Sequence, residues 1–209
     1  DVERSRGLGD VYKRQLEELE SALIEHKPAI LALVHAETST GVCQPMDGVG
    51  DLCRKHDCLL LLDTVTSLGG VPLYIDEWKV DLAYSCSQKG LSCPPGLGPF
   101  TMGPRAEEKM ASRSGKVPNW YLDVSLLNQY WGSDRVYHHT APVNMNFGMR
   151  EALRLLAEEG LDQAWARHRR NAERLWSGLE RQGLSMHVPE ERRLPTLTTV
   201  RIPDGVDGK

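Results

Sequence analysis

The sequence predicts an α/β fold built on a mainly parallel sheet. Two continuous apolar runs of strand length, residues 29–35 (AILALVH) and 58–62 (CLLLL), flank a segment with helical spacing. Strands that are apolar on both faces are typical of parallel sheets with helices on both sides. From residue 121 onward the pattern changes to long helical stripes, which predicts a second domain.

The first expected element is a helix over residues 16–26. Leu16, Leu19 and Leu23 repeat there at helical spacing, and Pro28 ends the pattern. This helix leads directly into the first apolar run, so the chain is expected to enter the sheet from a covering helix.

The second helix is expected between the two apolar runs. Pro45 is a candidate for its first position, because a proline is tolerated where the N–H group has no helical partner. Val49, Leu52 and Cys53 then share one helical face. Strands are expected over residues 29–35, 58–62, 81–85 and 98–102.

The second half of the chain predicts mostly helix. An aromatic-rich helix is expected over residues 121–131, and an apolar stripe from Met149 to Ala157 is ended by Gly160. A longer stripe of tryptophan and leucine over residues 161–179 is interpreted as a core-facing side, ended near Gly183. Further strands are expected over residues 184–188 and 196–202.

The change of pattern gives a domain division. We place the boundary near residues 140–165, with the larger domain over residues 16–150 and the start of a smaller α+β domain over residues 151–209. Residues 1–15 show no clean period and are expected to be disordered or non-native sequence. The chain begins with Asp and ends just after a strand-like segment, so we expect it to be part of a longer protein.

Composition excludes several classes of function. The 209 residues are 40% apolar and 26% charged, with a net charge of −4, and no basic stripe indicates a nucleic-acid surface. The longest apolar run is far shorter than the roughly 20 residues of a membrane span. The charged start is not a secretory signal. Five cysteines form neither CxxC pairs nor zinc spacing, which favours reduced thiols in a reducing compartment.

Candidate chemistry lies just past the two apolar strands. Ligands of open parallel sheets gather at the carboxyl ends of the strands, and the segments that follow are HAETSTG (residues 35–41) and DTVTS (residues 63–67). Asp63 follows four leucines, so its carboxylate is a candidate to point into a ligand crevice. The alternative is that Asp63 only caps a turn.

Lys89 lies after the next strand-like segment, in YSCSQKGLSCPPG, with no other charge for several positions on either side. A lysine and an aspartate at neighbouring strand ends suit pyridoxal phosphate: the amine forms an imine with the aldehyde, and the carboxylate pairs with the ring nitrogen. A site that desolvates the amine or places a cation nearby favours the neutral nucleophile. The alternative is an ordinary surface lysine before Pro94 and Pro95.

The segment SQKGLSCPPGLG resembles the cofactor-lysine segment of the alanine–glyoxylate and serine–pyruvate aminotransferases, which are fold-type-I enzymes dependent on pyridoxal phosphate. Other segments resemble the same family in the same order, from about Leu16 to about Pro203: HAETSTGVCQPMDGVGDLC, LLLLDTVTSLGGVPLYID, YLDVSLLNQYWG, YHHTAPV and LPTLTTV. The resemblance implies part of the large cofactor-binding domain of that fold, a mainly parallel sheet with helices on both faces, followed by the start of the smaller domain.

The resemblance also implies roles for single residues. Lys89 is expected to form the imine and, once freed by substrate, to move a proton between Cα and the cofactor. Asp63 is expected to pair with the pyridinium nitrogen. Thr38 stands where the family usually has serine and keeps the hydroxyl that bonds the cofactor. Gln88 is expected on the phosphate side. Ala36 stands where glycine is common.

Tyr137 and Thr140 match family residues that reach the phosphate from the neighbouring subunit, which implies a homodimer with shared sites. Between them, His138 and His139 could suggest a metal, but no third ligand shows suitable spacing, so packing is the preferred interpretation and no metal is expected. Gly69 and Gly70 are interpreted as a tight turn rather than a phosphate loop.

The expected function is transfer of an amino group from L-alanine or L-serine to glyoxylate or pyruvate, in ping-pong half-reactions. Alternatives are a non-catalytic paralogue or truncated product that only dimerises, and another fold-type-I enzyme, such as a phosphoserine aminotransferase-like protein or a cysteine desulfurase, which needs a catalytic cysteine on a mobile loop. A nicotinamide dehydrogenase is disfavoured because GxGxxG is absent.

Three family elements are not found in these 209 residues: the phosphate loop, the aromatic that stacks on the ring, and the arginine for the substrate carboxylate. We therefore expect this piece alone to be inactive or poorly folded. The resemblance implies a peroxisomal or mitochondrial location.

Overall fold

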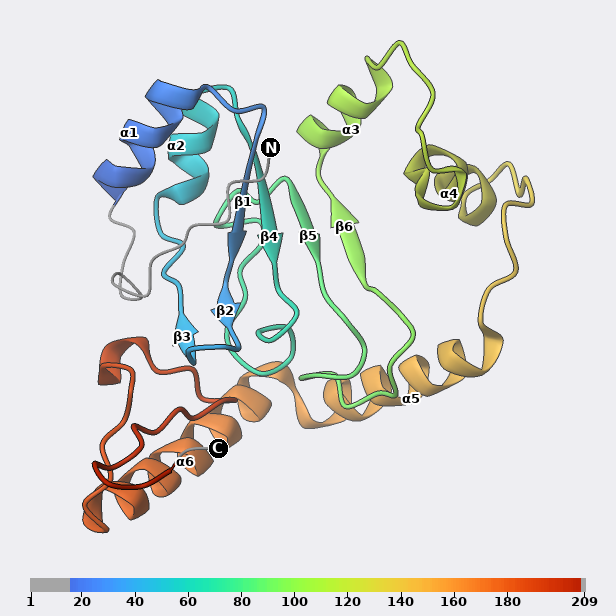
Figure 1. Ribbon diagram of the computed structural model, residues 1–209. Helices are drawn as coiled ribbons and strands as arrows, with labels where there is room; N and C mark the ends of the chain where they lie inside the picture. The colour runs from blue at the N-terminus through green and yellow to red at the C-terminus, as the bar shows by residue number, and fades with distance from the viewer. Residues whose placement is uncertain (1–15, 208–209) are drawn as a thin grey trace.

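The computed structural model describes residues 16–207, and its centre is a four-stranded sheet in the order β1–β4–β5–β6 (Figure 1). β1 (Ile30–Val34), β4 (Leu59–Asp63) and β5 (Leu82–Tyr84) run parallel, and β6 (Phe100–Met102) is antiparallel to β5. The predicted α/β fold with a mainly parallel sheet is confirmed. β4 has the predicted length, shifted by one residue, and the other three strands are each two residues shorter than predicted.

The carboxyl ends of the three parallel strands are aligned. In the register of the sheet Val34 lies beside Asp63, and Asp63 lies beside Tyr84. Parallel neighbours point their side chains to the same face, so these three residues share one face at one end of the sheet. The end of the sheet at which a ligand is predicted to bind is therefore the end that carries Asp63 and Tyr84.

One face of the sheet is covered by α1 (Leu16–His26) and α2 (Val49–Lys55), which lie together on one side of the strands in Figure 1. The helix over residues 16–26 is as predicted. Burial of its leucines and of the inward residues of β4 forms the main core, since apolar area removed from water drives folding at about 25 cal/mol per Å². The buried residues of this core are Leu19, Leu23, Met46, Val49, Cys53, Cys58, Leu60, Leu62, Val80 and Ala83.

The opposite face of the sheet is only partly covered by the described residues, which differs from the prediction of helices on both faces. In β1 exposure alternates along the strand, and Ile30 and Val34 are 48% and 41% exposed. Tyr84 and Phe100 continue this face at 40% and 49%. The apolar run of β1 thus has only one buried face here, although its composition is that of a strand covered on both.

A small antiparallel hairpin of β2 (Ala36–Glu37) and β3 (Val42–Cys43) follows β1. Gly41, at φ +79°, lets the chain turn back, because a left-handed conformation carries no penalty without a Cβ. The predicted start of the next helix at Pro45 is wrong: α2 begins at Val49 after Gly48, which is itself left-handed at φ +79°.

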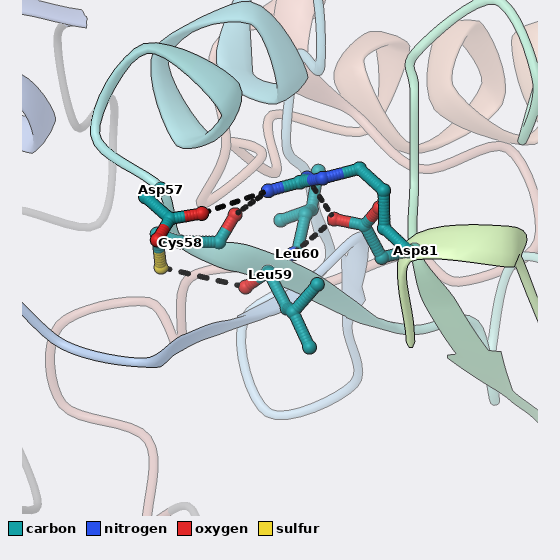
Figure 2. A network of polar contacts seen from close by, with 6 residues as sticks. Asp57, Cys58, Leu59, Leu60 and Asp81 are labelled. Atoms are coloured by element: carbon teal, nitrogen blue, oxygen red, sulfur yellow. Dashed lines mark hydrogen bonds and ion pairs between the residues drawn. The ribbon is translucent and has the colours of Figure 1, made fainter. Parts of the chain in front are cut away.

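A polar network fixes the amino end of β4 to the neighbouring elements (Figure 2). The buried carboxylate of Asp81 accepts hydrogen bonds from Leu60 N at 2.9 Å and from Arg105 Nη1 of α3 (Pro104–Ala111) at 2.8 Å. Arg105 Nη2 also donates to the carbonyl of Cys58 at 3.2 Å. This network lies at the opposite end of β4 from Asp63, so it supports the sheet without entering the candidate site.

The predicted helix over residues 121–131 is divided in two. A 3₁₀ turn, η1 (Trp120–Leu122), precedes α4 (Val124–Trp131), and Asp123 caps α4 by accepting a hydrogen bond from Ser125 N at 3.0 Å. An aspartate favours such a cap over a helix interior, which explains the break.

Two long helices follow, α5 (Val143–Glu159) and α6 (Leu161–Arg181), and Gly160 ends the first as predicted. In α6 Trp176 is buried against Met186, but Leu175 is 49% exposed, so the core-facing interpretation holds for only part of the stripe. Figure 1 shows α5 running across the end of the sheet where β1, β4 and β5 finish.

The strands predicted over residues 184–188 and 196–202 are wrong as continuous strands. They meet only in an isolated antiparallel bridge between Met186 and Val200, and a second 3₁₀ turn, η2 (Glu190–Arg192), lies between them. A pair of strands without further neighbours is only marginally stable in water, which explains why these two segments pair at a single bridge. The domain division remains a prediction, and the expectation for residues 1–15 lies outside the described residues.

Two predictions about composition can be compared with the structure. All five cysteines are free thiols, three buried and two partly buried, as predicted. Among residues 16–207 no helix combines the length and apolarity needed to cross a bilayer.

Candidate functional site

Asp63 ends β4 with both carboxylate oxygens engaged. Oδ1 accepts a hydrogen bond from Val65 N at 2.8 Å, and Oδ2 accepts one from the Tyr84 hydroxyl at 2.6 Å. The alternative that Asp63 caps a turn is therefore correct, because Oδ1 accepts from the backbone two residues further on. It does not exclude the second role, because a carboxylate has about four lone-pair sites and only two are used.

Lys89 lies in a closed loop that follows β5. The loop is tied by Ser92 N to the Lys89 carbonyl at 2.9 Å and by Cys93 N to the Ser87 carbonyl at 3.0 Å. The fully buried hydroxyl of Ser87 also donates to the Pro94 carbonyl at 2.6 Å. These bonds fix the backbone of the loop at Lys89, although the Lys89 side chain is exposed.

The exposure of Lys89 differs from the expectation that the site desolvates the amine. The described residues leave the Lys89 side chain exposed to water. Burial of the amine thus requires groups other than those of residues 16–207.

The loop of Lys89 packs directly on the turn that follows Asp63. A Cβ added to Gly90 would lie 2.3 Å from the Leu68 carbonyl oxygen and 3.0 Å from Gly70 N. On the other side, Gly69 has φ +81°, as the tight-turn interpretation of the two glycines predicts. The lysine-bearing loop and the aspartate-bearing turn are therefore held in backbone contact at the same end of the sheet.

This contact predicts a sensitive position at Gly90. We expect Gly90→Ala to lower the free energy of unfolding of the full-length protein by about 1–3 kcal/mol, because the added methyl group forces the two turns apart. Gly115→Ala is a matched control, since Gly115 is exposed with nothing within 4 Å of an added Cβ. Urea denaturation measures both, and equal stability of the two variants would contradict the close packing.

Two further predicted site residues lie near this end of the sheet. Thr38 is exposed in the turn between β2 and β3, directly beyond β1, and Gln88 is exposed beside Lys89. His35 N bonds to the Asp63 carbonyl at 3.0 Å, so the hairpin that bears Thr38 starts from the residue beside Asp63. Thr38, Asp63, Gln88 and Lys89 thus come from adjoining segments.

Tyr137 and Thr140 lie apart from those four residues, in the segment between α4 and α5. Their hydroxyl groups are 2.8 Å apart, and both residues are exposed, Tyr137 by 67%. Two adjacent hydroxyls on an exposed loop can donate to neighbouring oxygens of one anion. The structure brings this pair together, as their common predicted role requires.

His138 and His139 pack as predicted. The buried His138 is stacked on Trp120, with ring centroids 4.1 Å apart, and its Nε2 donates to the Trp120 carbonyl at 2.9 Å. Nδ1 of His138 lies 2.9 Å from Nδ1 of His139, and the tautomers of the two rings set which nitrogen donates. Within residues 16–207 no cluster of three or more His, Cys, Asp or Glu is placed to hold a metal ion.

A separate cavity of about 440 Å³ lies beside the hairpin and α6, with His35 and Cys43 in its wall. Burial lowers the pKa of the His35 imidazole to about 4. Burial also raises the pKa of the Cys43 thiol, in spite of the opposing effect of Arg169 and Arg192. Cys43 Sγ and His35 Nε2 are 3.7 Å apart, but a neutral imidazole beside a protonated thiol is not an activated nucleophile.

Comparison with known proteins gives this arrangement a family. The family model described as aminotransferase class-V matches residues 8–209. The chain belongs to the class-V aminotransferase family. The mainly parallel sheet and the predicted resemblance to fold-type-I aminotransferases are both confirmed by this assignment.

Relatives of this chain within the class-V family include alanine–glyoxylate aminotransferases. The chain is 47% identical over 192 residues to an alanine–glyoxylate aminotransferase of Oryctolagus cuniculus, covering 90% of this chain and 49% of the relative. A crystal structure of an alanine–glyoxylate aminotransferase from Nostoc sp. is 67% identical, with a TM-score of 0.91, covering 93% of this chain and 52% of that one.

A crystal structure of a ureidoglycine–glyoxylate aminotransferase from Bacillus subtilis is 38% identical, with a TM-score of 0.88, covering 92% of this chain and 50% of that chain. The chain therefore spans about half the length of the curated relatives it matches.

For this class-V chain, the chemistry of the donor set fits pyridoxal phosphate. A primary amine, a carboxylate at the adjoining strand end, an amide and several hydroxyls are the groups that the cofactor's aldehyde, ring nitrogen and phosphate require. Sequence reasoning missed Tyr84, which contacts Asp63. The available signal was its place at the end of the expected third strand, opposite the aspartate in a parallel sheet.

Proposed function

We propose that this chain supplies the lysine-bearing part of a pyridoxal phosphate-dependent aminotransferase site. The observation that carries the proposal is the backbone contact between the turn after Asp63 and the loop of Lys89. Asp63 ends β4, and the Lys89 loop follows the adjacent parallel strand β5, which supports a ligand site at this end of the sheet.

Pyridoxal phosphate supplies an electron-withdrawing ring that lowers the barrier to removing the substrate's Cα proton. Lys89 would bind the cofactor's aldehyde carbon and, when released by substrate, would move a proton to and from Cα. Asp63 would accept the hydrogen bond of the ring N–H, and Thr38 and Gln88 would contact the cofactor from the two flanking turns.

The proposal includes a homodimer in which Tyr137 and Thr140 of one subunit complete the phosphate site of the other. Both residues are exposed, and their hydroxyl groups lie 2.8 Å apart in the segment between α4 and α5. Aromatic side chains are enriched in protein interfaces, and five of them are 56–67% exposed between η1 and α5. They are Trp120, Tyr121, Trp131, Tyr137 and Phe147.

For the reaction we propose transfer from L-alanine or L-serine to glyoxylate or pyruvate. The named relatives support glyoxylate as acceptor, because the proteins named alanine–glyoxylate and (S)-ureidoglycine–glyoxylate transaminases share it while their donors differ. Identity to the first group is higher, at 47% against 37%, which favours alanine as donor.

The full-length protein carrying this sequence, supplied with pyridoxal phosphate, is expected to convert L-alanine and glyoxylate to pyruvate and glycine. Double-reciprocal plots at several alanine concentrations should be parallel, because each half-reaction releases its product before the second substrate binds. No amino transfer to glyoxylate from alanine or serine would contradict the proposal.

The alternative of a cysteine desulfurase is less well supported. Its reaction needs a thiolate on an accessible loop, whereas Cys93 is buried and Cys86 is partly buried. Burial also raises the pKa of Cys43 and of Cys58, and that of Cys53 to about 12. A purely dimerising, non-catalytic chain would not need the ordered contacts of Asp63 and Lys89, and the amino-transfer assay separates it from the enzyme.

A further inference from the structure

We propose that Tyr84 is a positioning residue, which holds the Asp63 carboxylate in the orientation needed to accept the hydrogen bond of the cofactor's ring nitrogen. The inference rests on the proposed function and extends it to a residue outside the set predicted from sequence. Tyr84 ends β5, and its backbone lies directly beside Asp63 in the register of the parallel sheet.

The geometry assigns the two oxygens of Asp63 to two different donors. Oδ1 is held by the backbone N–H of Val65, two residues further along the same chain segment. Oδ2 is held by the hydroxyl of Tyr84 on the neighbouring strand, at 2.6 Å. Two donors on opposite oxygens fix the plane of the carboxylate, whereas the backbone donor alone would leave rotation about the Cα–Cβ and Cβ–Cγ bonds less restricted.

Tyr84 acts as a donor and not as an acid or base. The hydrogen bond to the Asp63 carboxylate, followed by burial, raises the pKa of Tyr84 to about 12. The phenol therefore keeps its proton at every pH at which an aminotransferase would be assayed. Its proton stays directed at Oδ2, and the free lone pairs of the carboxylate remain available to a ligand.

Packing of the sheet does not explain the hydroxyl group. Tyr84 lies on the incompletely covered face and is 40% exposed, so a phenol there could be hydrated without contacting Asp63. The ring can contribute to packing as phenylalanine would. The hydroxyl adds one short bond, and that bond goes to the residue proposed to contact the ring nitrogen.

The test compares Tyr84→Phe with Tyr74→Phe in the full-length protein, using two cofactors. Tyr74 is a matched control, because it is also 40% exposed and lies against Trp78, away from Asp63. The cofactors are pyridoxal phosphate and its deaza analogue, in which the ring nitrogen is replaced by C–H. The readout is the Kd of the apoprotein for each cofactor, measured by quenching of tryptophan fluorescence.

Tyr84→Phe is expected to weaken binding of pyridoxal phosphate roughly tenfold, the effect of one hydrogen bond to a charged group. The Kd for the deaza analogue should change less than about twofold, because the analogue has no ring N–H for Asp63 to accept. Tyr74→Phe should leave both constants unchanged. Equal weakening for both cofactors, no weakening, or tighter binding by Tyr84→Phe would overturn the inference.

A second measurement needs no cofactor. Titration of tyrosinate absorbance in the apoprotein should show that Asp63→Asn lowers the pKa of one tyrosine from about 12 toward its usual range. An unchanged titration would show that the contact is not formed. Failure of the proposed function itself is distinguishable, since it would appear as lack of pyridoxal phosphate binding in the unmodified protein.

Discussion

Lys89→Ala is expected to lower kcat of the full-length protein by roughly 10²–10⁴-fold, the usual contribution of a positioned acid–base group. The loss follows because no other amine shares the loop: Lys89 is the only lysine between Lys79 and Lys109. Lys89→Arg should fail similarly, since a guanidinium keeps the charge but cannot lose a proton to act as nucleophile or base.

Lys109→Ala serves as the matched control for Lys89. Lys109 is also exposed, lies in the last turn of α3, and is expected to accept alanine without loss of helical structure. Initial rates of amino transfer at saturating pyridoxal phosphate measure all three variants. A Lys89→Ala protein with more than a tenth of the unmodified rate would place the catalytic amine elsewhere.

Asp81→Ala is expected to lower the free energy of unfolding by about 1–3 kcal/mol, because it leaves a buried backbone N–H without its acceptor and breaks a partly buried ion pair. The Asp81 side chain is 3% exposed, and its loss removes the acceptor of both Leu60 N and Arg105 Nη1. Leu60 N then stays buried without its acceptor, whereas Arg105, at 29% exposure, keeps its longer 4.0 Å contact with Asp57.

Asp51→Ala is the control for the buried pair. Asp51 forms an ion pair with Lys79, but its side chain is 63% exposed, so the expected loss is at most about 1 kcal/mol. Urea denaturation of the full-length protein compares the two variants. Losses of equal size would show that the Asp81 network of Figure 2 does not make the predicted contribution to the free energy of unfolding.

Much of the fold could be predicted from the sequence wherever local pattern and tertiary environment agree. The helix over residues 16–26 was predicted because Leu19 and Leu23 face the core that they help to build, although Leu16 is exposed. The strand run of residues 58–62 was predicted because β4 has neighbours on both sides.

Predictions failed where the environment overrides local pattern. β1 has the composition of a doubly buried strand, yet its outer face is exposed among the described residues. Pro45 could begin a helix, but the left-handed Gly48 places the start at Val49. The segments near Met186 and Val200 have strand-like sequences without the neighbours that would extend their single bridge.

The candidate site was predicted in its residues but not in its contacts. Position at strand ends indicated Asp63, and isolation from other charges indicated Lys89, because both signals are local in the sequence. The Tyr84–Asp63 bond depends on the strand register, and the contact of Gly90 with Leu68 depends on how two turns pack. Neither follows from residue type or spacing.

The most direct test of the account is reduction of the full-length protein with borohydride in the presence of pyridoxal phosphate, followed by peptide mapping. Reduction converts a covalent lysine–cofactor link into a stable label. The account predicts the label on Lys89, within SQKGLSCPPG. A label on a different lysine, or no label on a protein that binds the cofactor, would contradict it.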